Sequence, residues 1–194
     1  MRLFVAIALP EDVRDRLAAL QHGVPGARWV APENLHLTLR FIGEVDGHQA
    51  QDIDAALTGV HVPSFPLTLA GVGHFGCNAK TRSLWAGVEA GEPLKRLQAK
   101  VEQALQRAGV EPKGGKFKPH VTLARFKSNP GARLYDYLSR HALFRTQPFM
   151  AEHFVLYSSF LSQSGAIYRA EADYDLTRAP MAAGAPGEVS HGGS

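Results

Sequence analysis

The feature that most constrains this chain is a short pattern that occurs twice. Residues 35–41 read LHLTLRF, and residues 119–126 read PHVTLARF. In both copies polar and aliphatic residues alternate, which is the period-two pattern of a β-strand with one buried face. The pattern therefore predicts two strands, and each presents a histidine and a threonine side by side: His36 with Thr38, and His120 with Thr122.

One copy of this pattern would most simply be a surface strand whose polar residues face water. Two copies favour a duplicated unit, because a helix-like segment and a short loop precede each of them. Two imidazoles and two hydroxyls that converge on one cleft suit a phosphodiester. One neutral imidazole accepts a proton, one protonated imidazole donates a proton, and the hydroxyls bind the non-bridging oxygens.

Several separated motifs resemble those of the 2H phosphoesterases, and specifically of the RNA 2′,3′-cyclic phosphodiesterases, which are also called 2′-5′ RNA ligases. The motifs are residues 2–6 (RLFVA), 29–43 (WVAPENLHLTLRFIG), 117–125 (FKPHVTLAR), 156–159 (LYSS) and 165–168 (GAIY). The resemblance implies a bilobal α+β fold in which two antiparallel sheets enclose a cleft, with helices outside. It also implies hydrolysis of RNA-terminal 2′,3′-cyclic phosphate to a 2′-phosphate, which could extend to reversible 2′-5′ ligation. Within that reaction it favours His36 as the acid and His120 as the base.

Two arginines are further candidates for substrate binding, on opposite grounds. Strict alternation places Arg40 on the face of His36, and it places Arg125 on the face opposite His120 unless a bulge intervenes. The resemblance implies that Arg125 is a phosphate ligand, and a guanidinium suits that role. It makes a weaker claim for Arg40.

Residues 71–76 (GVGHFG) read as a glycine-rich turn. The segment lacks the Lys-Ser/Thr ending of a phosphate loop and the glycine spacing of a dinucleotide-binding motif. Phe75 is either a platform on which an RNA base stacks or a residue packed into the core. Both interpretations stay open, and Phe75 is retained as a candidate substrate-binding residue.

Metal-dependent catalysis is the main chemical alternative, because the chain contains nine histidines. Each His-x-Thr strand offers one good ligand, and no His-x-His, Cys-x-x-Cys or His/Asp cluster surrounds either copy. We therefore expect neither a metal nor a cofactor. Nucleophilic attack by Thr38 or Thr122 is a less simple role than phosphate binding, because no base held by an orienting group is expected beside either hydroxyl.

Composition places the chain among ordinary globular proteins, with 45% hydrophobic and 20% charged residues in a length of 194. The formal net charge of +3 permits a polyanionic partner without requiring one. The basic residues Lys113, Lys116 and Lys118 precede the second motif, where they could attract an RNA backbone.

The single cysteine, Cys77, excludes a disulfide within the chain and points to a reducing compartment. The apolar N-terminal segment is too short to span a membrane and lacks a secretory cleavage site. We expect a cytoplasmic monomer with no membrane partner, built as a single bilobal catalytic domain over residues 1–177. Residues 178–194 are rich in Ala, Gly, Pro and Ser and are expected to form a disordered tail.

Hydrophobic periodicity and helix-capping signals give the order of elements. Strands are expected over 2–9, 35–43, 64–72, 82–90, 119–126, 146–157 and 166–176, and helices over 10–22, 47–58, 93–108 and 131–141. Short strands mixed with helices favour an α+β protein over a doubly wound parallel sheet.

Two other functions fit the same residues. One is a cyclic phosphodiesterase that acts on a small nucleotide, and the other is a non-catalytic nucleotide or RNA binder with the same fold. The second is disfavoured because both histidines and both threonines are present.

Overall fold

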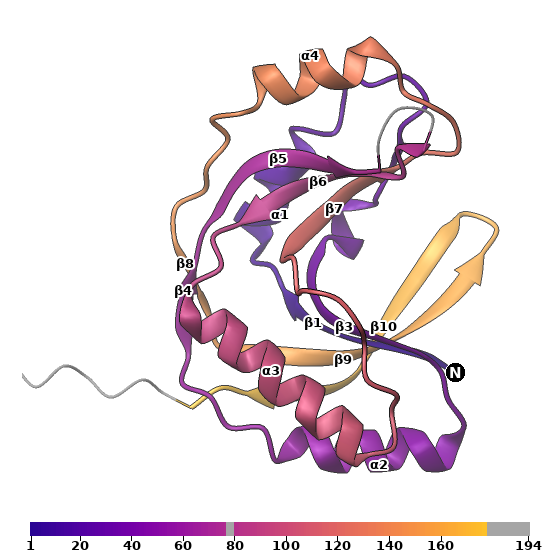
Figure 1. The fold of residues 1–194 in the computed structure, drawn as a ribbon, viewed down its shortest axis with the longest axis vertical. Coiled ribbons are helices and arrows are strands. Elements are labelled where there is room, and N and C mark those ends of the chain that lie inside the picture. The colour runs from indigo at the N-terminus through magenta and orange to yellow at the C-terminus, as the bar shows by residue number, and fades with distance from the viewer. Residues whose placement is uncertain (77–79, 178–194) are drawn as a thin grey trace, which may run out of the picture.

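The computed structural model of this chain describes residues 1–76 and 80–177; Cys77 and the predicted tail 178–194 lie outside the described residues. The described residues form two four-stranded antiparallel sheets and a short two-stranded one, with helices on the outside (Figure 1). This confirms the α+β class and the two-sheet architecture predicted from the sequence. The boundary of the catalytic domain at residue 177 stays a prediction.

The first sheet has the strand order β10-β9-β1-β3. Its strands are β1 (Arg2–Ala8), β3 (His36–Glu44), β9 (His153–Ser162) and β10 (Gly165–Asp175). Residues 3–7 of β1 are all buried, because this strand is internal to the sheet and both of its faces are covered. The helices α2 (Gly47–Thr58) and α3 (Glu92–Arg107) cover the outer face (Figure 1).

The second sheet has the strand order β2-β7-β6-β5. Its strands are β2 (Arg28–Trp29), β7 (His120–Arg125), β6 (Ser83–Val88) and β5 (Leu69–Phe75). Helix α4 (Ala132–Arg140) covers its outer side (Figure 1). The hydroxyl of Tyr137 in α4 donates to the carbonyl of Leu20 at 2.7 Å, which ties α4 to the segment after α1 (Glu11–Ala18).

The two sheets are built from the same succession of elements. In the first half the order is β1, α1 and β3, with the short β2 and a 3-10 turn (Pro32–Asn34) before β3, and in the second half it is β6, α3 and β7. In each half the two strands are antiparallel neighbours, and the second of them begins with the His-x-Thr pattern. A small sheet of β4 (Phe65–Leu67) and β8 (Phe149–Ala151) lies beside the two halves, and one hydrophobic cluster runs through both.

Several predictions about elements are wrong. The expected strand 64–72 is divided between β4 and β5, and the expected strand 146–157 is divided between β8 and β9. The first helix ends at Ala18 instead of continuing to residue 22. Residues 71–75 are part of β5 and pair with β6, whereas the sequence predicted a turn there. The glycines serve close packing: a Cβ at Gly73 would lie 2.3 Å from the Trp85 indole. Gly76, with φ of +85°, ends the strand, and a Cβ there would lie 2.1 Å from the Lys80 carbonyl oxygen.

Among the described helices, none is long and apolar enough to cross a membrane.

Candidate active site

The two histidines are held in the same way. His36 begins β3 and His120 begins β7. The Nδ1 atom of each ring lies 2.7 Å from a backbone carbonyl oxygen two residues earlier, that of Asn34 for His36 and that of Lys118 for His120. A carbonyl only accepts a hydrogen bond, so each Nδ1 carries the proton and donates it. This fixes the tautomer and leaves Nε2 of both rings to face a substrate.

A pocket of about 140 Å³ brings these rings together with other predicted site residues. It is lined by Val30, Asn34, His36, Thr38, Phe41, Phe75, Ser83, His120, Thr122, Arg125 and Tyr168. Both histidines, both threonines, Arg125 and Phe75 therefore share one cavity between the sheets. The Nε2 atom of His36 is 2.9 Å from the Thr38 hydroxyl, so imidazole and hydroxyl point at the same space.

A β-bulge at the same place in both strands decides which later side chains reach this pocket. Consecutive residues of β1 pair with Thr38 and Arg40, so Leu39 has no partner in the ladder. Consecutive residues of β6 likewise pair with Thr122 and Ala124 and skip Leu123. A bulge inserts one extra residue and shifts the alternation of faces beyond it. The fifth residue after each histidine therefore returns to the pocket face, and the fourth does not.

The bulge explains why Arg125 faces the pocket and Arg40 does not. Arg125, the fifth residue after His120, lines the pocket, as the resemblance implied and as strict alternation did not. The prediction that alternation places Arg40 on the His36 face is wrong. Arg40 is only 6% exposed, and its Nε donates to Glu102 Oε2 at 2.6 Å. Arg40 therefore lies on the face of β3 opposite the catalytic pocket, and the next residue, Phe41, lines the pocket in its place.

Phe75 forms part of the wall beside His120. Its ring centroid lies 4.7 Å from that of His120 with the rings nearly perpendicular, and 5.4 Å from that of Trp85. It lines the pocket and is half-buried. Phe75 therefore both packs on its neighbours and faces the site, so neither sequence interpretation alone describes it.

Sequence reasoning did not select five residues of this pocket as candidates, namely Val30, Asn34, Phe41, Ser83 and Tyr168. The ring of Tyr168 lies 5.4 Å from that of His36 in an edge-on arrangement. The Asn34 side chain donates to the Ala166 carbonyl at 2.8 Å, which joins the start of β3 to β10. All of these except Ser83 lie within motifs that carried the resemblance, and that was the available signal for them. Nothing in the sequence revealed the bulge that brings in Phe41.

The electrostatics of the pocket favour neutral imidazoles when no substrate is bound. The pKa of His36 is lowered to about 4, chiefly by burial; the Asn34 carbonyl opposes this shift, and the Arg125 charge and His120 contribute to it. Burial also lowers the pKa of His120, and the charges of Arg125 and Lys113 act in the same direction. The pocket is therefore electropositive around uncharged rings, an environment that attracts an anion.

Within residues 1–76 and 80–177, no group of three or more His, Cys, Asp or Glu side chains is placed to hold a metal ion.

Two antiparallel sheets that each contribute a His-x-Thr strand to one central pocket define a 2H phosphoesterase. The family model described as LigT like Phosphoesterase matches the chain twice, over residues 7–85 and 87–168. Each match contains one His-x-Thr strand, in agreement with the duplicated fold. The chain belongs to this family.

Named relatives match most of the chain. An RNA 2′,3′-cyclic phosphodiesterase of Thermus thermophilus is 36% identical over 188 residues, which is 91% of this chain and 90% of the relative. One of Thermotoga maritima is 33% identical over 175 residues, 87% of this chain and 92% of the relative. Among solved structures, E. coli LigT complexed with 3′-AMP aligns with a TM-score of 0.76 at 26% identity, covering 91% of this chain and 98% of that chain.

Proposed function

We propose that this protein hydrolyses the 2′,3′-cyclic phosphate at an RNA end to a 2′-phosphate, with His36 and His120 as the acid/base pair. The observation that carries this proposal is the matched placement of the two rings. Each has Nδ1 bonded to a backbone carbonyl, and both rings line one pocket that also contains Arg125; Nε2 of His36 accepts a hydrogen bond there from the Thr38 hydroxyl. The names of the relatives support the RNA end as substrate, and the 3′-AMP complex of E. coli LigT supports a nucleotide in the cleft.

In the proposed reaction a water attacks phosphorus opposite the O3′ atom. One neutral imidazole takes a proton from this water as the P–O bond forms. The P–O3′ bond breaks, and the other imidazole, in its protonated form, gives a proton to O3′. The products are a 3′-hydroxyl and a 2′-phosphate, and the two rings have exchanged protonation states.

The remaining polar groups bind the phosphate rather than transfer protons. Arg125 can donate two parallel hydrogen bonds to the non-bridging oxygens, and Thr38 and Thr122 can donate one each. A hydrogen bond to a charged group contributes roughly 1.5–3 kcal/mol. These groups therefore hold the phosphorus between the two Nε2 atoms and stabilise the charge that develops on its oxygens.

The negative charge of the bound substrate stabilises the protonated form of His36, which the acid role requires. With a pKa of about 4, His36 is neutral at pH 7 in the empty pocket. An anion bound beside it favours the imidazolium and raises that pKa. The resemblance assigns the acid role to His36, and this role then requires the phosphate to be bound first.

Replacement of the attacking water by the 5′-hydroxyl of a second RNA would form a 2′-5′ linkage through the same step. The geometry of the pair is the same for both reactions.

The direct test is incubation of an oligoribonucleotide that ends in 2′,3′-cyclic phosphate, in EDTA, followed by identification of the product isomer. The proposal predicts conversion to the 2′-phosphate at a rate unchanged by the chelator. A 3′-phosphate product would contradict the orientation of the pair. Loss of activity in EDTA with recovery on addition of Zn²⁺ or Mn²⁺ would contradict the metal-independent mechanism. The His36→Ala/His120→Ala double variant, prepared in parallel, controls for contaminating ribonuclease.

A further inference from the structure

We propose that a second pocket, beside the catalytic one, binds the internucleotide phosphate that precedes the cyclic end. The enzyme would then prefer an oligoribonucleotide to a cyclic mononucleotide. This inference rests on the proposed function and adds to it the length of RNA that the site recognises.

The sizes of the two pockets support a divided site. Pockets that hold small organic ligands typically measure roughly 300–1,000 Å³. The catalytic pocket, at about 140 Å³, is too small for a whole nucleotide. The second pocket measures about 390 Å³ and shares Thr38, Phe41, Phe75 and His120 with the first. A chain that leaves the catalytic phosphate can therefore pass directly into it.

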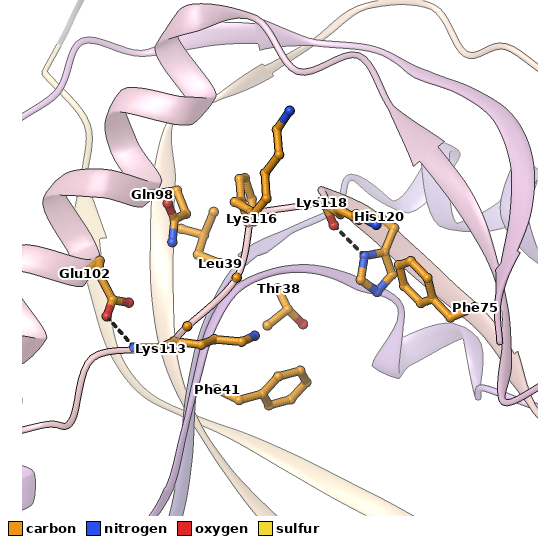
Figure 2. A pocket seen from close by; sticks show the side chains of 13 residues that line it. Thr38, Leu39, Phe41, Phe75, Gln98, Glu102, Lys113, Lys116, Lys118 and His120 are labelled. Carbon is orange, nitrogen blue, oxygen red and sulfur yellow. Dashed lines mark hydrogen bonds between the residues drawn. The ribbon is translucent and has the colours of Figure 1, made fainter.

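The charge of the second pocket suits a phosphate. Lys113, Lys116 and Lys118 all line it (Figure 2). Its one acidic lining residue is Glu102, and the Arg40 guanidinium pairs with that carboxylate. No ion pair to a carboxylate is found for the three lysines within the part of the chain that the structure describes. They are therefore available to neutralise a bound anion.

The segment that carries the three lysines, residues 113–118, is held in place at its first residue by hydrogen bonds. Lys113 N donates to Glu102 Oε1 at 3.1 Å (Figure 2). Arg40 donates Nε to the other oxygen of Glu102 and Nη2 to the carbonyl of Glu111. The side chains of Arg40 and Glu102 are only 7% and 17% exposed. This pair holds residues 111–113 against β3, and Lys113 Nζ then lies 6.0 Å from the Phe41 ring centroid. The buried arginine of the first motif thus builds the wall of the second pocket.

A pocket on the opposite side of Phe41 is less suited to a phosphate. This pocket, one of those that adjoin the catalytic pocket, measures about 380 Å³; its lining includes Phe4, Phe160 and Leu161, and Arg2 is the one charged residue among the described residues that line it. Transfer of a charged phosphate onto apolar walls is unfavourable, whereas a nucleobase can stack there. The RNA backbone is therefore assigned to the second pocket, which the three lysines line, and not to this apolar pocket.

The experiment compares kcat/KM for three substrates with the same terminal nucleoside. The first is a cyclic mononucleotide with a 5′-hydroxyl, the second carries a 5′-phosphate, and the third is a dinucleotide with a cyclic end. A dinucleotide whose internucleotide linkage is an uncharged methylphosphonate separates the charge from the second base. The wild-type enzyme is predicted to prefer the charged dinucleotide to the 5′-hydroxyl mononucleotide by about tenfold or more, since one charge-assisted contact is worth roughly that factor.

The Lys113→Ala/Lys116→Ala variant should lose most of the preference for the charged dinucleotide over the 5′-hydroxyl mononucleotide. The wild-type enzyme should show no such preference for the methylphosphonate dinucleotide. The matched control is Lys95→Ala, which removes a charge from the exposed face of α3 outside the second pocket and should keep the preference. The logarithmic salt slope for the charged dinucleotide should exceed that for the 5′-hydroxyl mononucleotide by about 0.7 per bound phosphate.

Three results would overturn the inference. Equal kcat/KM for mononucleotide and dinucleotide would show that no phosphate beyond the cyclic one is recognised. An equal loss on both substrates in the lysine variant would indicate general attraction rather than a subsite. If kcat/KM for the 5′-phosphorylated mononucleotide equalled that for the charged dinucleotide, the pocket would be assigned to a terminal phosphate instead of an RNA backbone. In each case hydrolysis of the mononucleotide leaves the proposed function standing, whereas absence of all hydrolysis would reject the function itself.

Discussion

Phe41 and Arg125 occupy the same position in the two halves of the site, yet one is aromatic and the other is a cation. Each is the second residue after a bulged leucine, and each lines the catalytic pocket. The residues that pair with them on the neighbouring strands differ in the same way: aromatic Phe4 pairs with Phe41, and polar Ser83 pairs with Arg125. The histidines and threonines obey the pseudo-twofold relation, and this position breaks it. We expect this asymmetry to favour one orientation of a bound phosphate, with its non-bridging oxygens toward Arg125.

Replacement of Arg125 by alanine should lower kcat/KM by about tenfold or more, because charge-assisted hydrogen bonds of roughly 1.5–3 kcal/mol are lost. The variant should also change the pH profile. The Arg125 charge lowers the pKa of both histidines, so its removal raises both values and moves the optimum of kcat/KM to higher pH. Arg125→Lys is the matched control, because it keeps the charge and loses the bidentate fork. It should retain the wild-type optimum with a reduced rate. An unchanged rate in Arg125→Ala would remove this residue from phosphate binding.

Replacement of Arg40 by methionine should affect stability far more than Arg125→Ala does. Its partner Glu102 would lose its cation and keep only the hydrogen bonds from Lys113 N and the Gln106 side chain, and loss of one member of a buried ion pair typically costs about 3 kcal/mol or more. Urea unfolding measures the change. The Arg40→Met/Glu102→Leu double variant removes both charges and should recover most of the lost free energy of unfolding. A single variant as stable as the wild type would show that the pair does not hold residues 111–113.

The contrast between these two arginines shows where sequence reasoning succeeds and where it stops. The duplicated pattern located both histidines, both threonines and the two strands that carry them, because period-two alternation is a local property of a strand. The bulges at Leu39 and Leu123 are set by pairing with β1 and β6, and no local pattern announces them. Only the resemblance placed Arg125 correctly.

The glycines near Phe75 show the same limit. A cluster of glycines usually marks a turn, yet Gly73 is needed because the indole of Trp85 lies against its backbone from the neighbouring strand. That contact belongs to the tertiary structure and could not be read from residues 71–76 alone.

A side chain outside the pocket contacts the bulge in β7, together with the backbone N–H of Val30, which donates to the Leu123 carbonyl at 2.9 Å. Gln21 Nε2 donates to the carbonyl of the bulged residue Leu123 at 3.1 Å and to that of Val30 at 2.7 Å. We expect Gln21→Ala to lower the free energy of unfolding by about 1–3 kcal/mol. Because Arg125 follows this bulge, kcat/KM should fall and the pH optimum should rise, as predicted for Arg125→Ala. The exposed Gln51 offers a control, since Gln51→Ala should change neither quantity. Loss of stability with an unaltered pH profile would mean that Gln21 only supports the fold.

The pH dependence of kcat/KM should be bell-shaped, with its maximum below about 6.5. The reactive form carries one proton on the pair, and its population is greatest midway between the two macroscopic pKa values of the coupled site. Burial holds the pKa of both His36 and His120 below the ordinary value near 6.5, so the midpoint lies below it as well. For kcat, which reports the complex, the bound phosphate raises both values and shifts the profile to higher pH. A maximum of kcat/KM above about pH 7 would contradict the neutral resting state of the rings.

The central claim is that His36 and His120 divide one acid and one base role, and a substrate with sulfur in place of O3′ tests it most directly. His36→Ala and His120→Ala should each lower turnover of the normal substrate by at least ~10²-fold, in the range that a general acid or base contributes. Their circular dichroism should match that of the wild type. A 3′-thiolate departs without a proton, so this substrate should restore turnover to the variant that lacks the acid and not to the variant that lacks the base. Recovery in His36→Ala alone is the predicted result; recovery in neither variant, or in both equally, would contradict the division of roles.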